Sequence, residues 1–553
     1  MRKYTVKNIP LDNPSLMLGE TLFHNANGYI GIRGNFEEAY PSDYDSIRGQ
    51  YINGFYDFAE MPQAEKLYGL IEEKQTMVNV VDTQGIQFTI DGETFSMFEG
   101  TILESSRTLD MDLGVTIREI TWQSPNGKKV AIKIQRMTSF SILPLFLIDF
   151  AVTPLNFSGE ISFYSTHKGD VKNYFNPKDP RVAGESLEHL VNHNSKTLSS
   201  KLLDSFSLVT AHTAKSDLTV CTGVTHAVLF ENPSKKNDVE NTFKKEQLQP
   251  TENFQEGEKI TLHSNKNQTI RLLKYTIICD SIRYGENLQE QVQALLESTI
   301  QTDITDLYQS QKDILAKFWN SCEVKIIGDE ELNQAVSYNL YQLMQSVGKD
   351  PHSNIAAKGL SGEGYEGHYF WDTEMYIQPF FTLTSREISK NLIRYRYTIL
   401  DHAKENAKLL GHKKGAAYTW RTIMGKECSG FFPAGSAQYH ISGDIVYAIV
   451  KYYLATKDLE IIKECGAEIA IEVARMWMDL GNYYQGTFRL NEVTGPDEYT
   501  CLVNNNYYTN ALAKFGLAWT VKFIKLLEKE NLTTDLLEKT KLTDEELLEF
   551  KKA

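Results

Sequence analysis

The period of the hydrophobic pattern changes once along this chain, near residue 280, and the change predicts two fold classes in one polypeptide. Before that point apolar and polar residues alternate, as in residues 130–134, where valine and isoleucine occupy every second position. A period of two places one face of a strand on a core. Asn126-Gly127 separates this run from a similar one over residues 115–120, and Asn-Gly favours a type I′ hairpin turn. We therefore expect an antiparallel β-sandwich over residues 1–275.

After residue 280, apolar residues recur at steps of three, four and seven, which is typical of amphipathic helices. This pattern predicts a helical linker over residues 276–325 and a domain of stacked helical hairpins over residues 326–553. Within the latter we expect helices over residues 331–347, 384–409, 436–455, 458–479 and 506–530. The loops between them are rich in Gly, Trp, Asp and Glu, so functional residues should gather there.

Charge and hydropathy exclude several classes of partner. The net charge of -15 opposes nucleic-acid binding, which depends on Lys and Arg neutralising phosphates. The N-terminus lacks the apolar region of a secretory signal, and the most apolar stretch, residues 141–155, is interrupted by prolines and is too short to span a bilayer. The six cysteines lie far apart, which favours free buried thiols over a zinc site or a disulfide framework. We expect a cytoplasmic protein that binds neither nucleic acid nor a membrane.

Two adjacent carboxylates stand on a defined turn near the end of the chain. Gly495-Pro496 precedes Asp497 and Glu498, and Tyr499 follows. A stiff loop of this kind suits acid/base chemistry, because burial beside an aromatic ring raises the pKa of a carboxylic acid so that it can donate a proton near neutral pH. The alternative is an acidic helix N-terminus, where Asp and Glu stabilise the helix dipole.

A glycine-spaced loop at residues 362–374 brings aromatic and acidic residues together. Aromatic faces cover the C–H surfaces of sugars, and carboxylates accept hydrogen bonds from their hydroxyls. Trp371 and Asp372 are therefore a candidate sugar-binding pair, with His368 close by in the sequence. Alternatively, Trp371 is a core residue and Asp372 caps a helix that begins near residue 373.

A third segment has the same mixture of aromatic and polar residues. Trp420 and Arg421 are candidate substrate contacts, and Lys426-Glu427 follows them. His440 and Asp444 are four residues apart and can share a helix face, but a structural hydrogen bond explains that spacing equally well.

With these residues identified, the chain resembles glycoside hydrolase family 65. Three ordered motifs carry the resemblance: residues 20–38, which include Gly28-Tyr-Ile-Gly31-Ile-Arg33-Gly34, then Gly367-His-Tyr-Phe-Trp371-Asp372-Thr-Glu374, and Gly495-Pro-Asp-Glu498-Tyr. The resemblance implies an N-terminal β-sandwich, a helical linker and a catalytic barrel of six helical hairpins, commonly in a homodimer.

The resemblance also implies an activity. In this family phosphate attacks the anomeric carbon of an α-linked glucose disaccharide from the face opposite a general acid, and β-glucose 1-phosphate leaves with inverted configuration. Glu498 becomes the expected acid, and Trp371 and Asp372 the expected contacts of the transferred glucose. His368, Trp420 and Arg421 stay candidate substrate contacts on the residues alone. No metal or organic cofactor is implied, and inorganic phosphate is the co-substrate. A hydrolase of the same family, or an inactive carbohydrate-binding fragment, stays open as an alternative.

Two departures from the family pattern qualify these expectations. Thr543-Asp-Glu-Glu546 is a capping box that opens a helix close to Ala553, whereas relatives continue through further barrel helices that supply the phosphate contacts. We therefore expect residues 1–553 alone to form an incomplete barrel that is unstable or inactive. Thr500-Cys501 follows Tyr499 where other members tend to carry a histidine and an acidic residue, so the sequence leaves the acceptor sugar and the linkage open.

Overall fold

The computed structural model describes residues 2–61, 70–174, 189–231, 243–248, 255–430 and 435–553. The chain divides into two compact units. The first comprises residues 1–57, 77–346 and 358–365, and the second comprises residues 58–76, 347–357 and 366–553. The domain limits predicted at residues 275 and 325 stay predictions.

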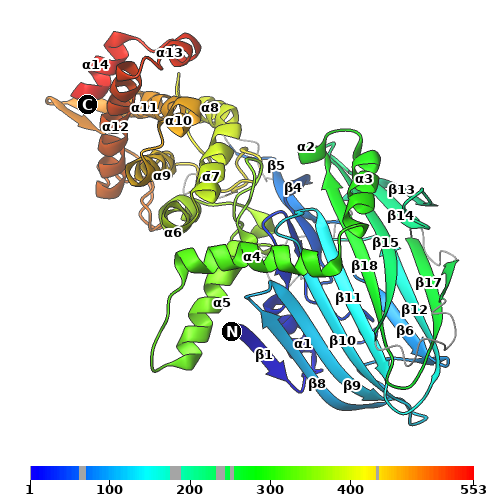
Figure 1. Cartoon of the computed structure of the whole chain (residues 1–553). Helices are drawn as coiled ribbons and strands as arrows, with labels where there is room; N and C mark the ends of the chain where they lie inside the picture. Colours follow the sequence, from blue (N-terminus) through cyan, green and yellow to red (C-terminus); the bar gives the residue numbers. More distant parts are fainter. Residues whose placement is uncertain (1, 62–69, 175–188, 232–242, 249–254, 431–434) are drawn as a thin grey trace. The chain divides into compact units, whose positions relative to one another are not determined.

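The first unit is built on antiparallel β-sheets (Figure 1). The nine-stranded sheet has the order β1 (Lys3–Lys7), β8 (Thr101–Asp110), β9 (Val115–Gln123), β10 (Lys129–Thr138), β11 (Leu145–Pro154), β18 (Thr269–Asp280), β15 (Thr219–Glu231), β14 (Phe206–Thr213) and β13 (Leu190–Leu198). The five-stranded sheet has the order β16 (Phe243–Gln247), β17 (Gln255–Ser264), β12 (Gly159–Lys168), β6 (Ile86–Ile90) and β7 (Glu93–Thr94). A third sheet contains β2 (Asn25–Ala26), β3 (Ile30–Ile32), β4 (Gln50–Glu60) and β5 (Glu73–Asn79).

The alternation in the sequence becomes two cores on opposite faces of the nine-stranded sheet. Ile148 and Phe150 face the five-stranded sheet, where the ring of Phe150 lies 5.7 Å from that of Phe163. Leu147, which precedes Ile148 in the strand, faces the other way into a second core. Because successive side chains of a strand point to opposite faces, strand β11 is buried on both sides. The predicted antiparallel β-domain is confirmed.

The hairpin predicted at Asn126-Gly127 is present, but its turn differs from the prediction. Strands β9 and β10 pair antiparallel, from Lys129 opposite Gln123 onward. Gly127 has φ +83, whereas Asn126 is not among the residues with positive φ. A type I′ turn needs positive φ at both central residues, so the prediction of that turn type was wrong. The loop is one residue longer, with only the glycine in the left-handed region.

The described part of the first unit also contains five helices: α1 (Asn13–Leu22), α2 (Ser281–Tyr284), α3 (Leu288–Ile300), α4 (Ile304–Cys322) and α5 (Glu330–Ser346). Helix α3 packs on strands β15 and β18 (Figure 1). A Cβ atom at Gly223 would lie 2.4 Å from Val292 of this helix, so a glycine is needed for the close approach. Helix α4 extends the second core through Leu307. The helices expected in residues 276–325 are present.

The second unit is mainly helical. Its elements are η1 (Gly364–Gly367), η2 (Thr373–Ile377), α6 (Gln378–Thr384), α7 (Arg386–Thr398), α8 (Leu400–Leu409), α9 (His440–Thr456), α10 (Leu459–Ile461), η3 (Ile462–Gly466), α11 (Ala467–Leu480), β19 (Asn482–Tyr484), β20 (Thr487–Arg489), α12 (Tyr507–Lys529), α13 (Thr534–Thr540) and α14 (Asp544–Lys552). Helix α12 packs against both α9 and α11. The predicted capping box is confirmed, because the side chains of Thr543 and Glu546 each accept from the other's backbone N–H.

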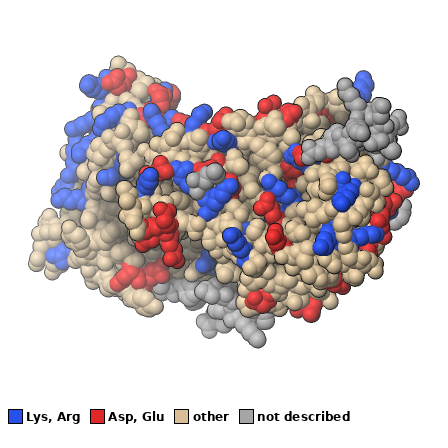
Figure 2. Space-filling model, turned by 60° about the horizontal axis from the view of Figure 1, so that its bottom comes forward, with Lys and Arg blue, Asp and Glu red and all other residues tan. Residues whose placement is uncertain are grey.

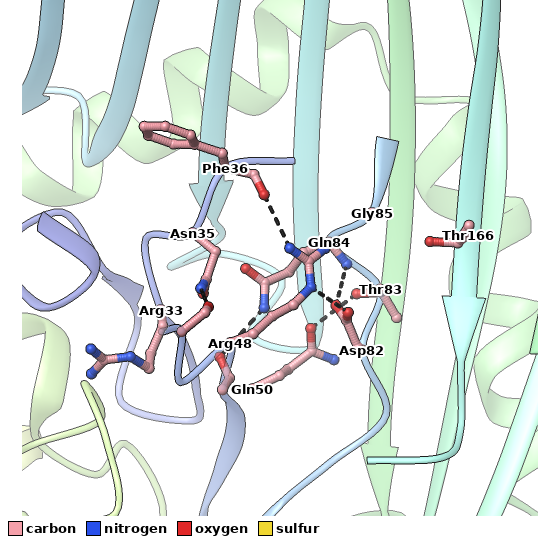
Figure 3. A network of polar contacts seen from close by, with 12 residues as sticks. Arg33, Asn35, Phe36, Arg48, Gln50, Asp82, Thr83, Gln84, Gly85 and Thr166 are labelled. Atoms are coloured by element: carbon pink, nitrogen blue, oxygen red, sulfur yellow. Dashed lines mark hydrogen bonds and ion pairs between the residues drawn. The ribbon is translucent and has the colours of Figure 1, made fainter. Parts of the chain in front are cut away.

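Charged residues of the motif at residues 20–38 are buried in the first unit. Arg118 donates to Glu37 at 2.7 Å and also pairs with Glu38. Beside them, Arg48 donates to Asp82 at 2.6 Å and to the carbonyl of Phe36 at 3.0 Å (Figure 3). Buried charges persist when they are paired and hydrogen-bonded. This motif therefore has a structural role in holding the β-domain together.

A buried histidine predicts how the stability of the first unit depends on pH. His167 accepts or donates at both ring nitrogens, 2.8 Å from Ser207 and 2.7 Å from Thr222, and burial lowers its pKa to about 3. The unfolded chain therefore binds a proton near pH 6.5 that the folded unit excludes, so stability falls as the pH decreases from 6.5 toward 3. We expect His167→Gln to flatten this acid limb in thermal unfolding followed from pH 7 to pH 4. His263→Gln, at an exposed position of β17, should leave the limb unchanged.

Acidic and basic side chains are interspersed on the face shown in Figure 2. Among the described residues, none of the helices is both long and apolar enough to cross a membrane.

The six cysteines are free thiols, and all but Cys501 are buried, as predicted.

Candidate active site

Trp371 and Asp372 are neighbours in the loop at residues 366–374, but they differ in their exposure to solvent. Trp371 is 9% exposed, whereas Asp372 is exposed. Asp372 precedes the π-helical turn η2 but makes no side-chain capping hydrogen bond. The capping interpretation is therefore not supported, and the carboxylate has no hydrogen-bond or ion-pair partner within the described part of the chain. Trp371 is thus largely buried, as the core interpretation expected, and the solvent-facing carboxylate beside it can accept hydrogen bonds from sugar hydroxyls.

Trp371 packs in an aromatic cluster with residues from α9 and α12. Its ring lies 4.9 Å from His440 and 6.3 Å from Tyr508. Asp444 accepts a hydrogen bond from Tyr508 at 2.7 Å, and the Nδ1 atom of His440 lies 2.8 Å from the same carboxylate. Burial raises the pKa of Asp444. The His440–Asp444 spacing thus serves to fix the two rings that support Trp371.

An ion pair behind this loop fixes its helical turn. Arg396 of α7 donates to both oxygens of Glu374, at 2.7 and 2.9 Å, and both side chains are at most 2% exposed. Arg396 also donates to the carbonyl of Phe370 at 3.4 Å. Because bidentate ion pairs constrain orientation as well as distance, Arg396 fixes the positions of Phe370 and Glu374, on either side of Trp371.

A buried carboxylate organises the loop that carries Trp420 and Arg421. Glu427 accepts hydrogen bonds from the backbone N–H groups of Trp420, Arg421, Cys428 and Ser429, over 2.7 to 3.3 Å. Burial nevertheless raises the pKa of this carboxyl. The ring of Trp420 lies 6.1 Å from Phe370, and Arg421 lies 3.6 Å from Glu366. These contacts bring the second and third sequence segments together.

His368 is fully buried beside the same loops. Its Nε2 atom bonds to the carbonyl of Gln75, and burial lowers its pKa to about 3. The imidazole is therefore neutral at working pH, which excludes it as a proton donor but leaves its Nδ1 atom available for a hydrogen bond.

The loop around Glu498 is short and internally bonded. The N–H of Gly495 donates to the carbonyl of Thr500 at 2.8 Å, and Asp497 accepts from the N–H of Thr500 at 3.0 Å. Glu498 has φ +63, in the left-handed region, and its side chain is exposed. Tyr499 is 98% exposed. The expected burial of Glu498 against this ring is not found, because the turn directs both residues outward.

Buried polar atoms without hydrogen-bond partners concentrate in these loops. Within the described residues they include Oε2 of Glu366, Nδ1 of His368, Oγ1 of Thr419, Nε of Arg421, Oγ of Ser436, both amide atoms of Gln438, Nε2 of His440 and Oδ1 of Asn510. Buried polar groups are nearly always paired with protein or with water, so these atoms can accept a polar ligand or ordered water. His440 contacts Trp371, and Trp420, which lies between Thr419 and Arg421, contacts Phe370.

Sequence reasoning missed several residues of this site. Glu366 and Glu427 stand in segments that were singled out, yet neither was selected, because burial of a surface-type residue leaves no mark in a single sequence. Lys74 and Gln75 lie some 290 residues before His368, and no local pattern links them to it. Among the described residues, none of the groups of His, Cys, Asp and Glu could hold a metal ion.

Comparison with known proteins identifies the family. The pattern described as "Glycosyl hydrolase family 65, N-terminal domain" matches residues 10–318, and the "Glycosyl hydrolase family 65 central catalytic domain" matches residues 337–553. The chain belongs to glycosyl hydrolase family 65. This family consists of enzymes, and the three sequence motifs predicted membership of it.

Individual relatives within family 65 are named as phosphorylases. An alpha,alpha-trehalose phosphorylase of Geobacillus stearothermophilus is 44% identical over all of this chain and 70% of its own length. A kojibiose phosphorylase of Thermoanaerobacter brockii is 30% identical over 96% of this chain and 68% of its own length. A solved structure titled as a putative kojibiose phosphorylase from the human microbiome matches with a TM-score of 0.85 at 24% identity, covering 100% of this chain and 69% of that one. The mixed β and helical architecture is thus the family 65 fold.

Proposed function

We propose that this chain belongs to an enzyme that catalyses inverting phosphorolysis of an α-linked glucose disaccharide, producing β-glucose 1-phosphate and a free sugar. The observation that carries the proposal is the set of buried polar atoms without partners in the loops that carry Trp371 and Arg421 and at the start of α9. Such atoms match the alternating donors and acceptors of a sugar ring. The names of the relatives support phosphorolysis over other reactions of sugars.

In the proposed mechanism Glu498 protonates the glycosidic oxygen while phosphate attacks the anomeric carbon from the opposite face. One protein carboxylate suffices, because phosphate replaces the base-activated water of an inverting hydrolase. The Glu498 carboxyl is exposed without substrate, and a bound disaccharide would remove water from around it.

The remaining residues would bind the transferred glucose. The indole face of Trp371 would cover C–H groups, and Asp372, His368, Trp420 and Arg421 would form hydrogen bonds or stacking contacts with it. A barrel of six helical hairpins, a homodimer and a cytoplasmic location stay predictions that accompany this function. No metal or organic cofactor takes part in the proposed steps.

Product analysis tests the function. Trehalose is the first substrate to supply and kojibiose the second, together with inorganic phosphate, and proton NMR reports the anomer that forms first. We expect β-glucose 1-phosphate and strict dependence on phosphate. Glucose release at full rate without phosphate would instead indicate a hydrolase, and sugar binding by calorimetry without turnover would indicate a carbohydrate-binding chain.

The indole platform predicts a selective effect on disaccharide binding. We expect Trp371→Leu to raise the KM for the disaccharide about 10- to 100-fold, since stacking of a ligand ring on an aromatic side chain contributes on the order of 1–3 kcal/mol in nucleic-acid complexes. The KM for phosphate should change little. Trp371→Phe should lose less than Trp371→Leu. Equal losses for both substrates in Trp371→Leu would contradict a platform role.

A further inference from the structure

The first half of strand β5 and the end of strand β4 belong to the second unit, although the other β-strands of the N-terminal half build the first. The side chain of Gln75 attaches this part of strand β5 to a loop of the second unit. The side-chain oxygen of Gln75 accepts from the hydroxyl of Thr422 at 3.0 Å and from the N–H of Ile423 at 3.0 Å, and its amide donates to the carbonyl of Lys426 at 3.3 Å. The strand is thereby bonded to the loop that carries Trp420 and Arg421.

Lys74, the preceding residue, forms an ion pair with Glu366. Its side chain is 17% exposed, and that of Glu366 is 6% exposed. The other carboxylate oxygen of Glu366, Oε2, lies 3.6 Å from Arg421 and 4.0 Å from the Nε2 atom of His368. One buried carboxylate is therefore surrounded by two cations and a neutral imidazole, from three separate segments of the chain.

Glu366, Arg421 and His368 each have one buried polar atom that forms no hydrogen bond within the described part of the chain. Oε2 of Glu366, Nε of Arg421 and Nδ1 of His368 are buried and have no hydrogen-bond partner among the described residues. Glu366 also has φ +56, a backbone conformation that costs free energy in a residue with a side chain. A strained, buried carboxylate with an unused oxygen is costly unless a ligand uses it.

We propose that Glu366 accepts a hydrogen bond from a hydroxyl of the substrate, and that Lys74 positions this carboxylate from strand β5. The ligand class is a sugar, because an acceptor, a guanidinium and an imidazole with unused atoms suit neighbouring hydroxyl groups. This inference rests on the proposed function. It adds to the site a substrate contact and a positioning residue from the N-terminal half of the chain.

The charge arrangement explains why Lys74 is needed. Its ammonium binds Oε1 of Glu366 and so leaves Oε2 turned toward Arg421 and His368. Without that ammonium, Arg421 is the remaining cation next to the carboxylate, and Glu366 is expected to rotate to form a closer pair with it. Oε2 would then pair with the guanidinium and could no longer accept a hydrogen bond from the substrate.

A double-mutant cycle tests the proposal. We expect Glu366→Gln to raise the KM for the disaccharide about 10- to 100-fold, with the KM for phosphate unchanged, because a hydrogen bond to a charged group is replaced by a weaker one. Lys74→Met should raise the same KM by a similar factor. The double variant should be no worse than Glu366→Gln, because both changes remove one coupled interaction. Lys74→Arg, which keeps the cation, should restore most of the affinity.

Glu464→Gln is the matched control. It makes the same substitution in an ion pair of the second unit, between Arg394 of α7 and Glu464 of η3, and should change either KM less than twofold. Near-ultraviolet circular dichroism of each variant reports whether its tertiary structure is intact. If Lys74→Met does not fold, the isosteric Glu366→Gln alone decides the question.

The outcomes separate this inference from the proposed function. If the parent protein turns over the disaccharide while Glu366→Gln and Lys74→Met stay within twofold of it, the substrate contact is wrong and the function stands. Additive losses in the double variant would also overturn the positioning role. If the parent protein neither binds nor cleaves a disaccharide, the proposed function itself fails, and the inference fails with it.

Discussion

Replacing Glu498 by glutamine is expected to lower kcat on a natural disaccharide about 10²- to 10⁴-fold, the range that general acid catalysis contributes. The amide has nearly the same shape but cannot release a proton to the glycosidic oxygen. The KM for the disaccharide should change little, because the effect belongs to the transition state. Initial rates of β-glucose 1-phosphate formation, measured at saturating phosphate, give the comparison directly.

Two controls make this result specific to proton donation. Glu492→Gln is a matched substitution in the same part of the chain, since Glu492 is exposed and has φ +56 as Glu498 has φ +63. It should retain full activity. An α-glucosyl fluoride needs little protonation of its leaving group, so Glu498→Gln should process it with phosphate at close to the parent rate. A variant equally inactive on the fluoride would show that Glu498 has a role other than that of the acid.

Replacing Arg396 by methionine is expected to destabilise the second unit by about 3–5 kcal/mol, the usual cost of leaving one partner of a buried ion pair uncompensated. Glu374 would then be buried at 1% exposure without its bidentate partner. The transition of the second unit in calorimetry should fall by roughly 10 °C for a unit of this size. Loss of the hydrogen bond to Phe370 would add to the effect near Trp371.

The companion variants separate burial of a charge from loss of packing. The double variant Arg396→Met/Glu374→Leu removes both charges and should recover much of the lost stability, because apolar side chains of similar size often replace a buried pair without cost. Arg394→Met breaks the more exposed pair with Glu464 and should cost about 1 kcal/mol or less. A double variant no more stable than Arg396→Met would contradict this account of the pair.

Much of the fold follows from local pattern. The periods of two and 3.6 residues place strands before residue 280 and helices after it, and the predicted helix at 506–530 corresponds to α12, Tyr507–Lys529. These successes depend on interactions between residues close in sequence. Asn126-Gly127 shows the limit even there: the dipeptide marked the hairpin, yet the turn type depended on the spacing of paired strands, and only Gly127 took positive φ.

The apolar pattern of α12 shows a second limit. The apolar stripe predicted for this helix comprises Tyr508, Leu512, Phe515, Trp519, Phe523 and Leu526. Leu512 and Phe523 are buried, but the other four are only half-buried. The most buried positions include Thr509 and Gly516, where α12 approaches its neighbours. Tyr508 lies outside these closest helix–helix contacts, and its ring packs instead in the aromatic cluster with Trp371.

By itself the sequence determined the order of the elements, the family and the candidate loops, because periodicity, turns and motifs are encoded in neighbouring residues. It could not determine burial. The exposure of Glu498, the pairing of Glu374 with Arg396, and the meeting of Lys74 with Glu366 all arise from contacts between residues that are distant along the chain or from the direction in which a loop turns. Only the tertiary structure decides these, since a carboxylate has the same sequence letter whether it is solvated, paired in a core or held for a substrate.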